Sequence, residues 1–153
     1  MNESLVNDMR SRLGPKAQAL QVRSPRRVYL DVAPEDLVAV AGVLFNDMGA
    51  RYAIASGMQT AEGFEVLHHF AFDPEHCVVS VRVRTESQDP QFDSVTPVIK
   101  GAEFIEREMH DLLGIAFRGH PNPQRLILSD DWPDGVYPLR RGKPWEGRVR
   151  KQL

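Results

Sequence analysis

Apolar residues repeat at the spacing of an α-helix in three stretches of the chain. In the first stretch Leu5, Met9 and Leu13 lie four residues apart, and Gly14 follows as a helix-ending residue. The two longer stretches repeat with a period of about 3.6 residues, which is typical of a helix with one buried face. Both end at a glycine. The predicted helices cover residues 3–13, 34–48 and 95–113.

Four other stretches alternate between apolar and polar residues, as β-strands do. In the last of them Val79, Val81 and Val83 share one face, and the opposite face is polar and is expected to meet solvent or a partner. Short turns join the last three stretches, which favours antiparallel neighbours. The predicted strands cover residues 26–32, 52–59, 64–72 and 78–85.

The composition changes after Gly114. Proline and glycine are frequent from residue 115 onwards, and the apolar run 125–128 is the one candidate there for regular structure. We therefore predict a globular domain over residues 1–117 and an extended partner-binding arm over residues 118–153. The fold class is α+β, with a mainly antiparallel sheet of about four strands, two long helices packed on it, a short N-terminal helix and the irregular arm.

The predicted arm is rich in large apolar side chains. Trp132, Tyr137, Leu139 and Trp145 carry more apolar area than is usually left in water, so they need a surface to pack on. A groove on another protein suits them better than the chain's own body. We expect the arm of the isolated chain to be mobile or to pack on a neighbouring copy.

The charge of the chain is unevenly distributed. The 153 residues have a net charge of −2, which does not indicate affinity for nucleic acid or anionic lipid. Residues 140–153 contain six basic residues and one acid, which leaves a charge of −7 on residues 1–139. A basic tail on an acidic body is typical of an interaction arm.

Signals for export or membrane insertion are lacking in the sequence. The single cysteine, Cys77, excludes an internal disulfide and a thiolate cluster. The amino terminus lacks the apolar core of a signal peptide, and the apolar run at residues 37–45 is less than half of the roughly 20 residues that a membrane span needs. We expect a cytoplasmic location, with membrane contact only through partners.

Four carboxylates gather in the last predicted helix. Glu103, Glu106, Glu108 and Asp111 have the spacing that acid–base or di-iron sites use. No other helix repeats a Glu-x-x-His pair, so a solvated or partner-facing surface is favoured over a metal site.

A second cluster contains His68, His69, His76 and Cys77. The two adjacent histidines point to opposite faces of the predicted strand, which disfavours a zinc site. Cys77 lacks a flanking motif for nucleophilic catalysis, and no glycine-rich nucleotide motif occurs in the chain. The basic residues at 148–151 are interpreted as a solvated terminus rather than an RNA-binding site.

Residues 106–121 follow the specific pattern ERExxDxxGIxFxGHP. Arg125-Leu126-Ile127-Leu128, Asp131-Trp132 and Pro138-Leu139-Arg140-Arg141 continue it in order. Over residues 103–141 the chain resembles the respiratory complex I 30 kDa subunit family, which forms part of NADH-quinone oxidoreductases. Related subunits occur in energy-converting membrane-bound hydrogenases.

The resemblance implies an α+β domain in the peripheral arm of such a complex, on the cytoplasmic face of the cell membrane. It implies tight binding to the 49 kDa subunit, which resembles the large subunit of nickel-iron hydrogenases. No cofactor is expected in this chain, and iron–sulfur clusters and a quinone or nickel-iron centre are expected in its partners. Gly142-Lys143-Pro144 departs from the family pattern and leaves the particular complex open.

Helical spacing makes Glu103–Arg107 and Arg107–Asp111 natural ion pairs, and Gly119 permits a sharp turn before the arm. Ion pairs of this kind contribute only about 0–1 kcal/mol each, so an oriented interface explains the charges better than stability does. We expect the arginines to pair with partner carboxylates. The predicted interface contains Glu106, Arg107, Glu108, Asp111, Gly119, His120, Pro121, Arg125, Trp132, Pro138, Leu139, Arg140 and Arg141.

Three functional hypotheses follow. The first is a cofactor-free structural subunit of a complex I-like NADH-quinone oxidoreductase, without catalysis by this chain alone. The second is the equivalent subunit of an energy-converting nickel-iron hydrogenase. The third is a small independent enzyme that uses His110, His120 and the nearby carboxylates as acid–base groups.

Overall fold

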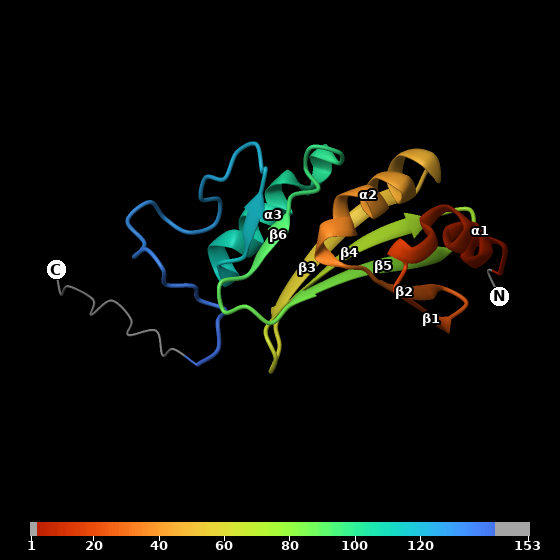
Figure 1. Ribbon diagram of the computed structural model, residues 1–153. Helices are drawn as coiled ribbons and strands as arrows, with labels where there is room; N and C mark the ends of the chain where they lie inside the picture. Colours follow the sequence, from red (N-terminus) through yellow and green to blue (C-terminus); the bar gives the residue numbers. More distant parts are fainter. Residues whose placement is uncertain (1–2, 143–153) are drawn as a thin grey trace.

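The computed structural model describes residues 3–142, and its central feature is a five-stranded sheet (Figure 1). The strands are arranged in the order β1-β2-β5-β4-β3. All neighbouring strands are antiparallel except β2 and β5, which are parallel. Their bounds are Ala19–Ser24 for β1, Arg27–Asp31 for β2, Arg51–Gln59 for β3, Phe64–Phe72 for β4 and Cys77–Thr85 for β5.

The helices pack on one face of this sheet and close the core. Helix α1 (Glu3–Leu13) lies at the β1–β2 end, and α3 (Glu103–Leu113) lies at the β3 end (Figure 1). Between them runs a helical segment made of η2 (Pro34–Asp36), α2 (Leu37–Gly42) and the π-helical turn η3 (Val43–Asp47). Short 3-10 turns also follow α1 at Gly14–Lys16 (η1) and precede α3 at Lys100–Ala102 (η4).

Close packing of α3 on the sheet depends on Gly57 in β3. A Cβ at this position would lie 2.8 Å from Met109 Sδ and 3.1 Å from Leu113 Cδ1. Both contact distances are shorter than side chains normally allow, so a Cβ here would require the Met109 and Leu113 side chains to shift, and glycine lets the helix approach this strand closely. The result is a core in which α3 sits directly over β3.

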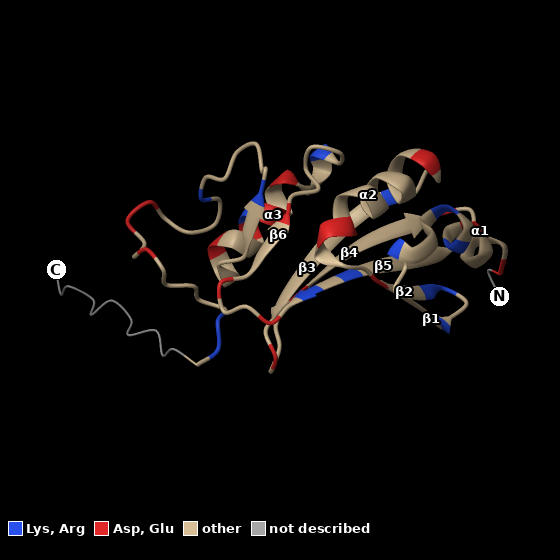
Figure 2. Ribbon diagram, in the orientation of Figure 1, with Lys and Arg blue, Asp and Glu red and all other residues tan. Residues whose placement is uncertain are grey.

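The opposite face of the sheet is polar, as the alternation in residues 78–85 predicted. Arg82 pairs with Asp31, and Arg84 pairs with Glu65. The basic residues of β5 are visible along the strand in Figure 2. Val79, Val81 and Val83 are fully buried on the other face, so the predicted division of this strand is confirmed.

A second, two-stranded sheet lies beside α3. Strands β6 (Gln91–Asp93) and β7 (Ala116–Arg118) pair in parallel, and Phe92 is fully buried. This small sheet joins the segment before α3 to the segment after it.

The predicted α+β fold, with a mainly antiparallel sheet and a short N-terminal helix, is confirmed, but the predicted start of the last helix is wrong. The helix predicted from residue 95 begins as an α-helix at Glu103. Pro97 disfavours helical geometry at residue 96, and residues 95–99 form a turn in which Val98 N and Ile99 N donate to Val95 O. The main sheet has five strands, because β1 pairs as a hairpin with β2. Residues 143–153, with Trp145 and much of the basic tail, lie outside the described residues.

Candidate partner interface

Helix α3 ends where the arm begins to pack on it. Gly114 has φ +70°, a left-handed conformation, and its N–H donates to His110 O. A Cβ at this glycine would lie 2.4 Å from a ring carbon of Tyr137. Both the backbone conformation and the covering aromatic ring therefore require glycine here.

Glu106, which was predicted at the interface, lies inside the protein in the isolated chain. Its side chain is fully buried, and its carboxylate accepts hydrogen bonds from Ser94 Oγ, Val95 N and Thr96 Oγ1. Burial raises the pKa of Glu106, and these three donors and nearby His120 oppose that rise. The residue fastens the loop at 94–96 to α3, which holds the helix in place.

Asp111 fixes the arm to α3. One carboxylate oxygen, Oδ2, accepts from the backbone N–H groups of Leu126, Ile127 and Leu128 at 2.8, 2.8 and 3.1 Å. Burial acts to raise the pKa of Asp111, but the three backbone donors hold it below its usual value. Asp111 is 3% exposed in the isolated chain, and its place at an interface stays a prediction.

Arg107 holds the same part of the arm from the preceding turn of the helix. Its guanidinium donates to Gln124 O at 2.8 Å and to Arg125 O at 2.9 Å. The predicted pair with Glu103 is present at 4.0 Å. The predicted pair with Asp111 is not among the ion pairs of residues 3–142, since each partner binds the arm backbone instead.

Arg140 and Arg125 of the arm have similar internal roles. Arg140 donates to Leu113 O and Gly114 O at the end of α3, and its guanidinium lies 5.0 Å from the Phe64 ring centroid and 4.6 Å from that of Tyr137. Arg125 donates to three carbonyl groups of the arm, including Trp132 O, and pairs with an exposed aspartate. These guanidinium groups are occupied within the chain, so the pairing that we expected with partner carboxylates is not available to them in this conformation.

The histidines of the signature are also tied to the backbone. His110 Nδ1 lies 3.0 Å from Ile115 O. His120 Nε2 lies 3.1 Å from Glu103 O, and its Nδ1 accepts from Asn122 N at 3.0 Å. With both ring nitrogens of His120 engaged, the acid–base enzyme hypothesis loses one of its two histidines.

The arm therefore packs on its own body over residues 118–142, contrary to the expectation that it lacks cover there. Trp132 is half-buried and its Nε1–H donates to Val136 O, and Leu139 N donates to Leu112 O. The physical reason is that α3 offers side chains that bind the arm's main chain, which an argument from apolar area alone overlooks.

Several large apolar side chains nevertheless remain exposed on α3 and the arm. Phe104 is 61% exposed, Ile127 is 54% and Leu139 is 59%, with Leu126 at 37%. Other predicted interface residues at the surface are Gly119, Pro121, Pro138 and Arg141, with Glu108 partly exposed. The arm thus has one side bound to α3 and another side that presents apolar groups to a partner.

The cluster of histidines around His68 does not form a metal-binding arrangement in the described residues. His68 is fully buried with its Nδ1 3.0 Å from Tyr52 Oη, and burial lowers its pKa to about 3. Its neighbour His69 faces the other side of the sheet, 2.9 Å from Ser80 Oγ, as predicted. No group of three or more metal-ligating side chains occurs within residues 3–142.

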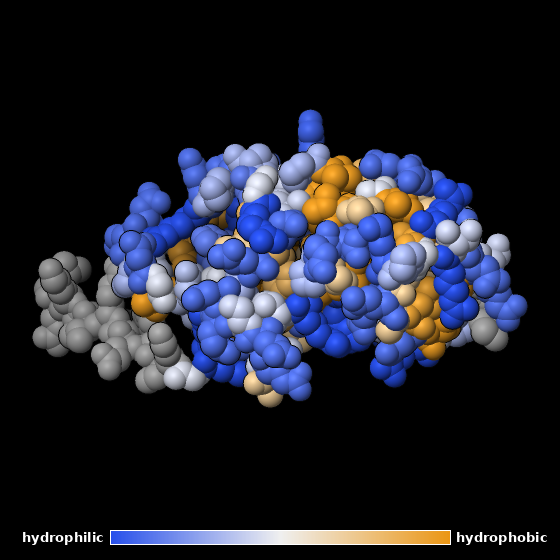
Figure 3. Space-filling view, viewed as in Figure 1, coloured by the Kyte–Doolittle hydropathy of each residue, from blue (hydrophilic) through white to orange (hydrophobic). Residues whose placement is uncertain are grey.

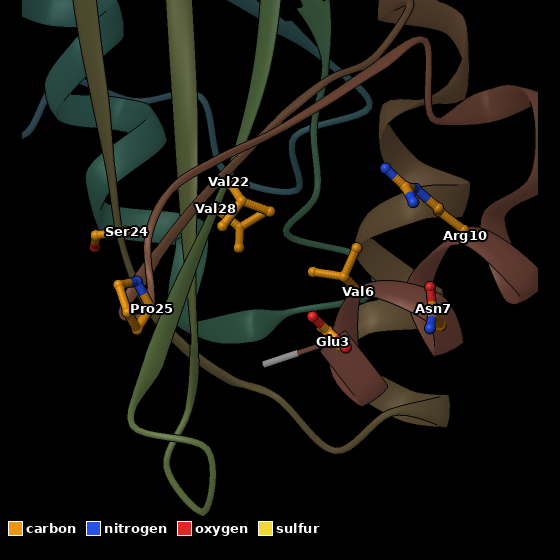
Figure 4. A pocket seen from close by; sticks show the side chains of 8 residues that line it. All are labelled: Glu3, Val6, Asn7, Arg10, Val22, Ser24, Pro25 and Val28. Atoms are coloured by element: carbon orange, nitrogen blue, oxygen red, sulfur yellow. The ribbon is translucent and has the colours of Figure 1, made fainter. Parts of the chain in front are cut away.

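Two of the cavities in the described part of the chain lie beside α1 and beside the arm. A groove of about 350 Å³ separates α1 from the β1–β2 hairpin, with Val6, Val22 and Val28 at its floor and Arg10 at its rim (Figure 4). A second space, of about 280 Å³, lies between α3 and the arm beside Trp132. Figure 3 shows the side of Figure 1 as mainly hydrophilic, with apolar atoms over α2 and at the α1 end. Within the described part of the chain, no helix is long and apolar enough to cross a membrane.

Comparison with known proteins gives a family match over most of the chain. Residues 30–149 match the family described as "Respiratory-chain NADH dehydrogenase, 30 Kd subunit". An NADH-quinone oxidoreductase subunit of Citrifermentans bemidjiense is 29% identical over 130 residues, which cover 81% of this chain and 78% of that protein. Formate hydrogenlyase subunit 5 of Escherichia coli is 45% identical over 65 residues, which cover 42% of this chain and 11% of that protein. The chain spans 11% to 56% of the length of the first curated relatives that it matches.

A solved structure supports the fold. The structure of the membrane-bound sulfane sulfur reductase, an archaeal respiratory membrane complex, contains a chain that matches with a TM-score of 0.77 at 21% identity. The match covers 90% of this chain and 82% of that chain.

Proposed function

Because the chain belongs to the family of the respiratory-chain NADH dehydrogenase 30 kDa subunit, we propose that it is a structural subunit of a complex I-like assembly. In this proposal it docks the hydrogenase-like large subunit, the 49 kDa subunit of complex I, in the peripheral arm. It reaches the cytoplasmic face of the membrane through its partners. The iron–sulfur clusters and the quinone or nickel-iron centre belong to those partners.

The observation that carries the proposal is that the main chain of the arm is bound by side chains of its own body, whereas apolar side chains of the arm remain exposed. Asp111, Arg107 and Arg140 bind main-chain groups of the arm and of the end of α3. The same segment exposes Ile127 and Leu139 by more than half. An arm that is ordered before binding loses less conformational entropy when a partner covers it. Charged side chains that bind only groups of their own chain can therefore support docking, because they hold the arm in the conformation that the partner would bind.

One experiment distinguishes specific docking through the arm from nonspecific binding by exposed apolar residues. A tagged chain expressed in its native cell is purified from membranes, together with Ile127→Asp and Val78→Asp variants. Val78 is a matched control because it is also an exposed apolar residue, 37% exposed, but lies in β5 far from the arm along the sheet.

We expect the unaltered chain and the Val78→Asp variant to bring down a hydrogenase-like large subunit and iron–sulfur proteins. We expect the Ile127→Asp variant to lose this material, with an affinity lower by about a hundredfold or more, since a buried charge without a partner costs about 3–5 kcal/mol. Recovery of the chain without any such subunit contradicts the proposal.

The second candidate is the equivalent subunit of an energy-converting nickel-iron hydrogenase. Two Escherichia coli relatives favour it: formate hydrogenlyase subunit 5 at 45% identity and hydrogenase-4 component G at 39% identity, each over less than half of this chain. The purified assembly decides between the two candidates. NADH-dependent quinone reduction supports the first, and hydrogen evolution with bound nickel supports the second.

A further inference from the structure

Strand β3 is a long edge strand whose outer side is unpaired within residues 3–142. It has nine residues, pairs with β4, and makes no other backbone hydrogen bond to a described residue. Monomeric proteins normally shorten such edges or protect them with lysine, proline or inward-pointing charges. Within the described residues this edge has a bulge between Tyr52 and Ile54, an ion pair of Arg51 with Asp73, and at its end a hydrogen bond from Arg141 N of the arm to Gln59 Oε1.

Apolar side chains flank this edge on the face of the sheet away from the helices. Ile54 is 51% exposed and Met58 is 43% exposed. Both pair with residues of β4, His69 and Glu65, that point away from the core. A strand added beside β3 would place alternate side chains against this pair.

The helical face offers a second flank above the same edge. Glu106 points towards residues 94–96, and the loop that follows them contacts the α2 segment, since Val98 lies beside Gly42. Phe104 is two residues away on the helix and therefore points away from that side; it shares its side of α3 with Arg107, whose guanidinium lies 5.8 Å from the ring centroid, and with Asp111, which binds the arm. Phe104 is 61% exposed, and Glu108, one turn later, makes no ion pair within the described residues. The edge therefore has Ile54 and Met58 on one face of the sheet and α3, with the partly exposed Glu108, on the other.

A second copy of the chain does not fit this edge. Two copies of β3 paired about a two-fold axis would lie about 4.8 Å apart with their α3 helices on the same face. Packed helices need about 8–10 Å. Because α3 touches β3 at Gly57, two copies paired about this position would bring their α3 helices closer together than that distance.

We infer that the β3 edge accepts a single extended strand from another subunit of the assembly, an inference that rests on the proposed function. The partner strand that pairs with β3 carries no helix on the face of the sheet where α3 lies. It carries apolar residues at alternate positions, which pack on Ile54 and Met58, and a lysine or arginine on the other side, which meets Glu108. Main-chain hydrogen bonds supply the affinity, and these side chains supply the selectivity.

Photo-cross-linking in the native assembly tests the occupant. p-Benzoylphenylalanine is placed at Ile54, and at Val78 as a control that shares the exposed face of the sheet but lies on an interior strand. We expect a cross-link from position 54 to one extended segment of a different subunit and none from position 78. A cross-link to a second copy, to residues 143–153 of the same chain, or to nothing overturns the inference.

Amide exchange tests the main-chain pairing itself, which a side-chain contact alone would not change. In the assembly, the amides of residues 51–59 are expected to exchange at about one tenth of their rate in the isolated chain, or more slowly still. The exchange rates at the opposite edge, residues 19–24, are expected to be unchanged. An Ile54→Lys variant that folds as stably as the unaltered chain is expected to lose this protection. If the chain still co-purifies with the large subunit while exchange at 51–59 is unchanged, the strand inference fails and the proposed function stands. If nothing co-purifies, the proposed function fails as well.

Discussion

Replacing Asp111 with alanine removes the acceptor that binds three consecutive amides of the arm. In the structure all three N–H groups, of residues 126–128, converge on one oxygen at 2.8 to 3.1 Å. A hydrogen bond to a charged group contributes about 1.5–3 kcal/mol. Because the three share one acceptor and Leu126 and Ile127 are exposed to water, we expect a loss of about 2–4 kcal/mol rather than the sum.

This loss is expected to appear as local opening of the arm. An energy of about 2–4 kcal/mol corresponds to amide exchange roughly 30- to 700-fold faster at residues 126–128. The strands of the central sheet are expected to exchange as before. Asp130→Asn is the matched control, because Asp130 is an exposed carboxylate of the same arm whose side chain forms no hydrogen bond to a described residue.

The pH dependence has a defined sign. The pKa of Asp111 is lower in the folded chain than in the unfolded chain, where it is about 3.9. Its contribution is therefore complete above that value and is lost as the pH falls through the folded-state pKa. Unchanged exchange at residues 126–128 in the Asp111→Ala variant, or an arm that opens equally at neutral and at acid pH, would refute the reasoning.

Three further predictions concern stability. Gly114→Ala is expected to reduce the free energy of unfolding by about 1–3 kcal/mol in urea denaturation, whereas Gly101→Ala, which meets no atom within 4 Å, is expected to be near neutral. Glu106→Ala is expected to cost about 3–5 kcal/mol, and Glu106→Gln less, because the alanine variant leaves buried donors without an acceptor. His68 has a folded-state pKa of about 3, below its unfolded value of about 6.5, so stability is constant above pH 6.5 and falls by about 1.4 kcal/mol per unit below it. Urea denaturation across this pH range, with His68→Gln for comparison, checks the slope, which the variant is expected to lack.

Much of the fold was accessible from the sequence where long, regular patterns decide the structure. The helix at 3–13 and the strand at 64–72 were predicted with their observed bounds, because each has a sustained repeat and clear turn residues beside it. Strand β1 was missed because none of its residues is fully buried, so its sequence lacks the apolar–polar alternation of a strand with one buried face. The start of α3 was predicted too early, since the turn at 95–99 depends on the distant carboxylate of Glu106.

The signature identified the family, but it did not show which groups the charged side chains of α3 bind. Helical spacing made Arg107 and Asp111 natural partners of each other. It contained no information on main-chain groups 15 to 18 residues later, which compete for the same side chains and bind them. An exposed helix and a helix covered by its own arm have the same sequence pattern, so only the tertiary structure separates a docking residue from a residue that holds the docking surface.

Native mass spectrometry of the assembly purified through a tag on this chain tests the central claim most directly. After partial dissociation, the account predicts a stable subcomplex that contains one copy of this chain and one copy of a hydrogenase-like large subunit. Release of this chain alone or as a homo-oligomer, with the large subunit retained among the other proteins, would contradict it.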